Sequence, residues 1–187
     1  MTPTALLISR LPSDSRKDSF AGKEVVKVDI QDLNKDVVVR LMEAFSVANH
    51  GLLDSLMSDD YLQHNPTPNG REPVKRMADI LQTAFPDGRM VIKDIVAEGD
   101  KVVARISMTG THTGPLIGIA PTGKHVEMTS IDIWRVENGI CVEHWDEIDR
   151  VGLLRQIGPK AIIRALLKGS SRRQILSFAR EQGIMRR

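Results

Sequence analysis

The chain has 187 residues and a net charge of +2, with 41% hydrophobic and 27% charged residues. This length suits one ordinary domain with an appendage, the composition is that of a soluble globular protein, and no apolar run approaches the roughly 18 residues that cross a bilayer. The single cysteine, Cys141, excludes an intramolecular disulfide, and the five histidines show no spacing typical of metal ligands, so no metal site is expected.

Residues 1–33 are expected to form an extension ahead of the main fold. They mix proline, serine and charged residues with one strand-like run at 25–30. A short apolar run at 5–8 has no basic residue before it, so a secretory signal is not expected and a cytoplasmic location is the default.

Three helices are expected before the main run of strands. Apolar residues near helical spacing predict helices over 37–48 and 72–85, with a shorter helix over about 52–57 between them. Residues 61–70 are expected to loop, because the residue before Pro66 is disfavoured in a helix and a turn-rich run follows.

The second half of the chain changes to strand-like alternation. Strands are predicted over 90–97, 101–111, 125–136 and 140–148, and turn signals separate the first pair and the last pair. The link at 113–124 holds three glycines and two prolines, so it is too long for a tight hairpin and is expected to cross an open end of the sheet. Helices followed by an antiparallel meander predict an α+β fold.

A short closing helix is predicted over 151–158, and a basic tail follows over 159–187. The tail holds eight basic residues and one acid, so the rest of the chain carries a net charge of −5. Two apolar stripes at helical spacing predict two amphipathic helices, the second capped by Ser170 or Ser171. Nucleic acid would use the charges but not the stripes, so no nucleic-acid partner is expected. The tail is expected to cover the body or a partner subunit, with an anionic membrane surface as the less favoured alternative.

The strongest polar constellation lies on the last predicted strand, where alternation puts His144 and Asp146 on one face. A three-residue turn at 137–139 would set Asp132 opposite His144 and Ser130 opposite Asp146. A two-residue turn would shift the register by one and set the pair against isoleucines. The three-residue turn is favoured.

With the favoured turn, one face gathers polar groups within an apolar surround. A carboxylate there is partly desolvated, which makes Asp146 a candidate base near neutral pH. A facing His144 could relay the proton or donate a hydrogen bond to an enolate oxygen, and Asp132 is the third catalytic candidate. The candidate substrate-binding residues are His64, expected to approach from the helical side, and Ser130, Trp134 and Met128.

Five short motifs follow one another along the chain. They are Tyr61-Leu62-Gln63-His64-Asn65-Pro66, Ala84-Phe85-Pro86-Asp87, Gly110-Thr111-His112-Thr113-Gly114, Pro121-Thr122-Gly123-Lys124 and Glu143-His144-Trp145-Asp146. Over about 37–158 the pattern resembles the SnoaL-like polyketide cyclases, within the superfamily that includes nuclear transport factor two and ketosteroid isomerase.

The resemblance implies a cone-shaped α+β barrel with N-terminal helices packed on a curved antiparallel sheet, spanning 34–158 and assembling as a homo-oligomer. It also implies ring closure by intramolecular aldol condensation on a small hydrophobic carbonyl compound, with no metal or organic cofactor. In those enzymes an aspartate near the end of the final strand is the acid/base, and Asp146 holds the matching place. The preceding strand often supplies a histidine in the family, whereas this chain has Asp132, which is similar to the ketosteroid isomerases.

The expected function is therefore cofactor-free proton transfer of the cyclase type. The alternatives are a non-catalytic carrier of a small hydrophobic ligand, or an isomerase or hydroxylase, because one scaffold of this kind hosts several functions.

Overall fold

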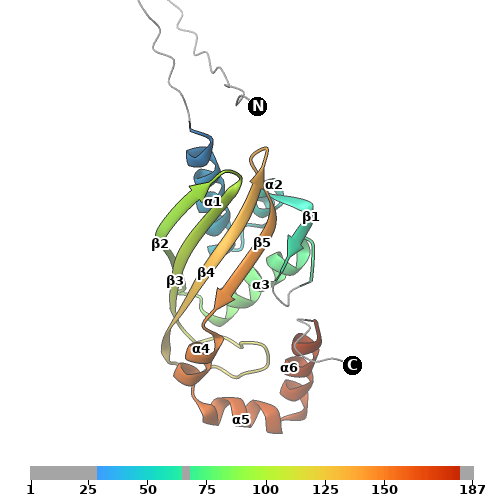
Figure 1. The fold of residues 1–187 in the computed structure, drawn as a ribbon. Coiled ribbons are helices and arrows are strands. Elements are labelled where there is room, and N and C mark those ends of the chain that lie inside the picture. The colour runs from blue at the N-terminus through green and yellow to red at the C-terminus, as the bar shows by residue number, and fades with distance from the viewer. Residues whose placement is uncertain (1–28, 65–67, 182–187) are drawn as a thin grey trace, which may run out of the picture.

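The computed structural model describes residues 29–64 and 68–181, which form the six helices and five strands of Figure 1. In chain order these are α1 (Ile30–Ser46), α2 (His50–Leu56), β1 (Met57–Gln63), α3 (Arg71–Ala84), β2 (Arg89–Glu98), β3 (Lys101–Thr111), β4 (His125–Glu137), β5 (Ile140–Ile148), α4 (Arg150–Ile157), α5 (Pro159–Leu167) and α6 (Gly169–Glu181). Most of the strand-like run predicted at 25–30 lies outside the described residues, and its last residue, Ile30, begins α1 instead.

The five strands form one open, curved sheet in the order β1-β5-β4-β3-β2. Strands β2 to β5 are antiparallel neighbours, as predicted, but β1 pairs with β5 in parallel, so the sheet is mixed and does not close into a barrel. Strand β1 was expected to be the end of a helix and a loop. Its Ser58, Asp59 and Asp60 are poor strand formers, so the pairing with β5 rather than local preference stabilises it.

The helices α1, α2 and α3 cover one face of the sheet (Figure 1). Side chains that are nearly inaccessible to solvent join them to the strands, among them Val38 and Leu53 from the helices and Val102, Trp134 and Cys141 from the sheet. Burial raises the pKa of the Cys141 thiol to about 12. This thiol is therefore a neutral core group.

Side-chain caps fix where the first two helices begin. The carboxylate of Asp29 accepts a hydrogen bond from the Gln31 backbone N–H at 3.0 Å, and the side chain of Asn49 accepts one from the Leu52 N–H at 3.1 Å. Each cap satisfies a backbone donor that has no partner within its own helix. Helix α1 thus starts ahead of residue 34, where the main fold was expected to begin.

The β4–β5 hairpin differs from both registers considered for it. Asn138 and Gly139 form a two-residue turn, both with positive φ (53° and 79°), which suits the right-handed twist of a hairpin. A bulge then adds one residue on β5, since Val136 pairs with Cys141 but Arg135 pairs with Glu143.

The resulting pairs are Trp134 with His144 and Asp132 with Asp146, so the predicted pairing of Asp132 with His144 is wrong by two residues. Because side chains alternate with a period of two, the shift of two beyond the bulge keeps Asp132, His144 and Asp146 on their predicted face. Between the turn and the bulge the shift is only one, so Cys141 instead of Ile140 pairs with Val136 and faces the core.

The C-terminal helices pack at the end of the sheet away from the β4–β5 turn (Figure 1). Leu153 and Ile157 of α4 and Ala165 of α5 are buried in a second apolar cluster, with Ile175 of α6 packed against it. The expectation that the tail covers the body therefore holds for these residues. Ser170 and Ser171 do not precede the last helix but lie within its first turn, because α6 begins at Gly169.

No helix among the described residues is long and apolar enough to cross a membrane.

Candidate active site

A pocket of about 320 Å³ lies between the sheet, the helices α1, α3 and α4, and the segment that links β3 to β4. That volume suits a small organic molecule. Most of the lining is apolar, including Leu41, Phe45, Met77, Leu81, Met90, Ile106, Met108, Leu116, Ile119, Met128, Trp134, Ile148, Leu153 and Phe178. The polar lining residues are Tyr61, Gln63, Ser130, Asp132, His144, Asp146 and Arg150. The lining thus combines a broad apolar wall with a compact polar cluster.

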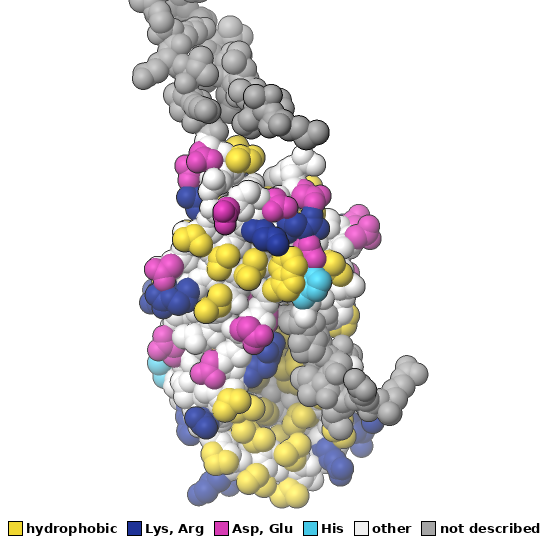
Figure 2. Space-filling model, in the orientation of Figure 1, with side chains coloured by type: hydrophobic (Ala, Val, Ile, Leu, Met, Phe, Trp, Pro, Cys, Tyr) yellow, Lys and Arg dark blue, Asp and Glu magenta, His cyan; other side chains and the backbone are white. Residues whose placement is uncertain are grey.

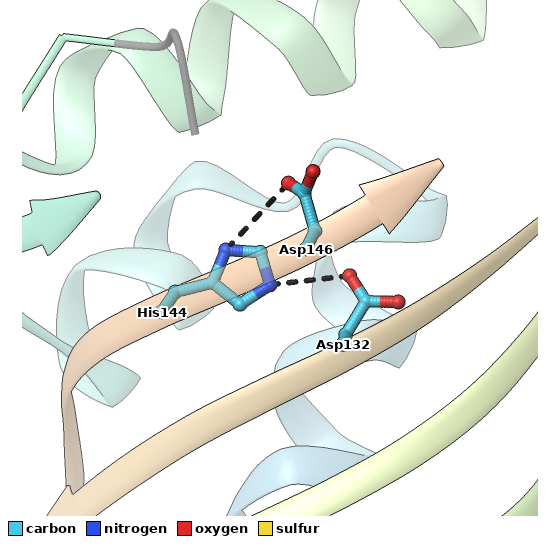
Figure 3. A group of neighbouring side chains, drawn as sticks. All are labelled: Asp132, His144 and Asp146. Atoms are coloured by element: carbon cyan, nitrogen blue, oxygen red, sulfur yellow. Dashed lines mark hydrogen bonds and ion pairs between the residues drawn. The ribbon is translucent and has the colours of Figure 1, made fainter. Parts of the chain in front are cut away.

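Three ionisable side chains form the centre of that cluster (Figure 3). His144 and Asp146 point inward from β5, and Asp132 points toward them from β4. The Nε2 atom of His144 lies 3.1 Å from Oδ1 of Asp132, and its Nδ1 atom lies 4.0 Å from Oδ2 of Asp146. All three side chains are at most 10% exposed, so each charge acts in a site that is largely shielded from water.

The imidazole of His144 is held from several sides. Oε1 of Gln63, on β1, lies 2.7 Å from Nδ1, so both ring nitrogens have an oxygen within hydrogen-bonding distance. The indole of Trp134 stacks on the ring with centroids 4.9 Å apart, and the Tyr61 ring lies with its centroid 6.3 Å away and its plane inclined by 25°. Side chains restrained in this way suit a group that must keep one orientation during a reaction.

The other two members of the trio have partners of their own. Ser130 donates a hydrogen bond from Oγ to Oδ2 of Asp132 at 2.5 Å, which orients that carboxylate toward His144. A guanidinium nitrogen of Arg150, at the start of α4, lies 3.6 Å from Oδ1 of Asp146. The β4–β5 pair thus supplies the carboxylates, and neighbouring residues fix their orientation.

The pocket contains Ser130, Trp134, Met128, Asp132, His144 and Asp146 together, as their predicted shared face requires. His64 does not join them, and its predicted place in the pocket is wrong. Tyr61 and Gln63 face inward on β1, so alternation turns His64 outward, where it stacks on Trp145 at 4.6 Å and lies 2.6 Å from Glu143.

The outward group around His64 is a surface network. Glu143 also accepts a hydrogen bond from Nε of Arg135 at 2.5 Å, and these contacts with His64 and Arg135 lower the pKa of the Glu143 carboxyl. Arg135 pairs in turn with Glu137. The network stabilises the outer side of β4 and β5 and lies on the face opposite the pocket.

Sequence reasoning missed Tyr61, Gln63, Arg150 and Phe178 as pocket residues. The first two were hidden because β1 was not recognised as a strand. Its alternation, with buried Met57 and Tyr61 in phase with Gln63, is the signal that could have found them. Burial raises the pKa of the Tyr61 phenol well above its ordinary range, so the phenol stays protonated.

Donor atoms of Asp132, His144 and Asp146 all lie within 4.8 Å of one another, so their chemistry could serve a divalent cation. However, both nitrogens of His144 already face oxygen atoms of Gln63 and Asp132. The present arrangement therefore fits a hydrogen-bonded acid/base group better than a set of metal ligands, whose imidazole must leave one nitrogen lone pair open.

Comparison with known proteins identifies the fold and the family. The sequence model of the SnoaL-like polyketide cyclase matches residues 35–157, which is well over half of the chain. The chain belongs to the SnoaL-like polyketide cyclase family.

Among individual SnoaL-like proteins, the chain is 28% identical over 130 residues to the aklanonic acid methyl ester cyclase DauD of Streptomyces sp. strain C5, covering 66% of this chain and 80% of DauD. The crystal structure of IdmH from Streptomyces antibioticus, a candidate polyketide cyclase, is similar with a TM-score of 0.61 and 34% identity over 67% of this chain and 98% of IdmH. AclR of Streptomyces galilaeus, a candidate hydroxylase, has a TM-score of 0.62 and 28% identity over 68% of this chain and 97% of AclR.

Proposed function

We propose that this protein is a cofactor-free enzyme that closes a ring in a small hydrophobic carbonyl compound by intramolecular aldol condensation. The observation that carries the proposal is the close grouping of Asp132, His144 and Asp146 inside a mainly apolar pocket. Membership of the SnoaL-like family and the similarity to DauD support the same reaction class.

Asp146 is the proposed acid/base. Its carboxylate removes a proton from the carbon next to a carbonyl, and the enolate carbon then attacks a second carbonyl of the same molecule. The alkoxide that forms takes the proton back, so the condensation needs no oxidant, reductant or external base. Arg150, 3.6 Å from Asp146, balances the charge of this carboxylate before the proton arrives.

His144 and Asp132 are proposed to assist at the other end of the developing charge. The imidazole lies between the two carboxylates and is proposed to exchange its contact with Gln63 for a hydrogen bond donated to the enolate oxygen as charge accumulates there. Trp134, Met128 and Ser130 are proposed to contact the substrate, because they line the same wall as the trio.

A non-catalytic carrier is the second candidate, since the apolar lining alone would bind a hydrophobic ligand. A carrier has no need of three ionisable groups at most 10% exposed, which cost free energy to bury. The polar cluster therefore favours the enzyme. The isomerase alternative would use the same acid/base groups on another substrate, whereas a hydroxylase would also need an oxidant such as dioxygen. The similarity to AclR keeps the hydroxylase among the alternatives.

The first prediction is that Asp146→Asn lowers turnover by about 100-fold or more, because it removes the proton acceptor while keeping the side-chain shape. Aklanonic acid methyl ester, the compound in the name of the DauD cyclase, is the first substrate to assay. Binding of this ester is measured separately from its turnover. Glu147→Gln is the matched control, since Glu147 is the next acid along β5 and is exposed.

Binding that persists in Asp146→Asn without turnover would support the enzyme. Substrate binding without turnover in the unaltered protein would support the carrier. An Asp146→Asn variant that turns over the substrate at the unaltered rate would exclude Asp146 as the base. The same assays after treatment with a chelator test the expected independence from metal.

Self-association is a further part of the proposal. Hydrophobic side chains gather over the outer face of the sheet (Figure 2), where Ile131 is 54% and Val96 62% exposed. A homo-oligomer would bury this face, and its partner would leave the pocket open on the opposite side. The expected cytoplasmic location also remains a prediction.

A further inference from the structure

The end of the molecule formed by α5 carries large apolar side chains that no part of the described chain covers. Ile163, Leu166 and Leu167 are 54%, 44% and 81% exposed on a helix of nine residues. Their neighbours Ile162 and Ala165 pack inward, so the apolar surface continues around the helix to its solvent side. Figure 2 shows hydrophobic side chains gathered at this end, with basic side chains on both sides of them.

A groove of about 540 Å³ runs along one flank of the same helix. Lys160 and Arg164 line it at a spacing of four residues, which places them one above the other on the helix, and Lys168 lines it directly after the last turn. Lys124 lines it from the opposite wall, in the segment between β3 and β4. The floor is apolar and is formed by Ile157, Ala161 and Ala165.

No acidic side chain in the described part of the chain neutralises the positive charge of this groove. None of the four cations forms an ion pair with an acid within residues 29–64 and 68–180. Helix α5 also begins at the groove, after Gly158, without a side-chain cap, so its partial positive end adds to the field. The ammonium group of Lys124 lies close to the start of this helix, since a Cβ atom added to Gly158 would be 2.8 Å from Lys124 Nζ.

We propose that α5 and this groove dock on an anionic phospholipid surface. Ile163 and Leu167 would enter the boundary of the acyl chains, and the phosphate groups of the lipids would meet Lys124, Lys160, Arg164 and Lys168. An amphipathic helix with basic residues beside its apolar face is the pattern that lies in a membrane interface. The matched family segment ends at residue 157, so residues 159–168, which supply the exposed apolar side chains and three of the four cations, lie beyond the part shared with the family model.

Other partners satisfy only part of this surface. Nucleic acid would use the four cations but would leave Ile163 and Leu167 exposed to water. A second copy of the chain, paired by a twofold axis through α5, would cover the apolar residues but bring two sets of unpaired cations together. An anionic lipid surface accommodates the apolar residues and the cations at once.

The test uses the full chain in co-sedimentation with vesicles of phosphatidylcholine alone and of phosphatidylcholine mixed with phosphatidylglycerol. We expect binding to the mixed vesicles only, weakened by salt. The triple variant Lys160→Gln, Arg164→Gln, Lys168→Gln should bind roughly 100-fold more weakly. The double variant Ile163→Ser, Leu167→Ser should lose at least about tenfold.

Matched controls remove the same groups elsewhere on the molecule. Arg76→Gln, Arg89→Gln, Lys93→Gln removes three exposed cations from α3 and β2, and Leu33→Ser, Val47→Ser removes two exposed apolar side chains from α1 and its end. Both controls should bind the mixed vesicles as the unaltered chain does. Melting temperatures should be equal for all the variants, because the replaced side chains point outward.

Three results would overturn the proposal. One is equal binding to both kinds of vesicle, or binding that the α5 variants do not change. Another is a fall in molecular mass in solution on Ile163→Ser, Leu167→Ser, which would show that a second copy covers α5. The third is binding of inorganic phosphate or duplex DNA that depends on the cations, without binding to the mixed vesicles.

Discussion

At the scale of single residues, Gln63 at the end of β1 and His64 directly after it have opposite surroundings. Gln63 faces the pocket and contacts His144, whereas His64 faces outward and contacts Glu143 and Trp145. A histidine next to a pocket is an obvious catalytic candidate from sequence. Because side chains alternate along the strand, it is nevertheless the amide of Gln63 that lies beside the proposed catalytic groups.

The second prediction follows from this contrast. Gln63→Leu should lower kcat by up to about 100-fold, because it removes the oxygen atom that helps to fix the His144 ring. It should also alter the pH profile of kcat, which a purely structural change would leave in place. His64→Leu is the control and should keep near-unaltered turnover. The opposite ranking of the two variants would show that the outward histidine takes part in the reaction.

A third prediction concerns His112, which the proposed reaction does not use. The residue is inaccessible to solvent, its Nδ1 atom lies 3.1 Å from Thr122 Oγ1, and its ring packs against Phe85. Burial lowers the pKa of this imidazole below its ordinary value of 6.5. The folded protein therefore resists protonation, while the unfolded chain takes up the proton as the pH falls through that value.

The contribution of His112 to stability is thus fully present above about pH 6.5 and is lost as the pH falls below it. We expect the free energy of unfolding to fall less steeply between about pH 7 and pH 5 in His112→Gln than in the unaltered chain. His125→Gln, at an exposed histidine, is the control. Parallel pH curves for all three proteins would contradict the prediction.

At the scale of elements, the sequence predicted β2 to β5, α3 and α4 to within a few residues, because each has a clear apolar period or turn signal. Helix α1 was predicted to exist but begins at Ile30, well ahead of the apolar stripe that starts at Val37. The alternation within β1 was overlooked, because its Ser58, Asp59 and Asp60 disfavour a strand and its partner β5 is remote in sequence. The β4–β5 register was also missed, because the bulge opposite Arg135 leaves no mark in the alternation. The shared face of Asp132, His144 and Asp146 could still be predicted, since the error was an even number of residues.

The C-terminal helices give the fourth prediction. Deleting residues after Gly158 should lower the melting temperature, because Ala165 and Ile175 would no longer cover Leu153 and Ile157. The separate substitution Phe178→Ala should raise KM more than it lowers kcat, since Phe178 lines the pocket from α6 with an apolar ring that takes no part in proton transfer.

Thermal melts and steady-state kinetics measure these two effects. Arg173→Ala is the control on α6, because its side chain is exposed. An unchanged melting temperature in the truncated chain would show that the tail does not stabilise the body, and an unchanged KM in Phe178→Ala would show that α6 does not limit the pocket.

At the scale of the whole molecule, charge and apolar surface are separated along the chain. The body is acidic and holds the pocket, whereas the tail is basic and adds Phe178 to the pocket wall. The apolar outer face of the sheet and the exposed side of α5 are distinct surfaces, since they belong to different elements. Self-association through the sheet would therefore leave α5 free to meet a lipid surface.

The central claim is that Asp146 removes a proton from the carbon next to the substrate carbonyl. The most direct measurement uses aklanonic acid methyl ester, or another methyl ester that the protein binds, deuterated at that carbon, and follows deuterium loss and ring formation by mass spectrometry. We expect the unaltered chain to release one deuterium to water for each ring that it forms, and Asp146→Asn to bind the ester with neither change. Ring formation and deuterium loss at equal rates in both proteins would contradict the claim.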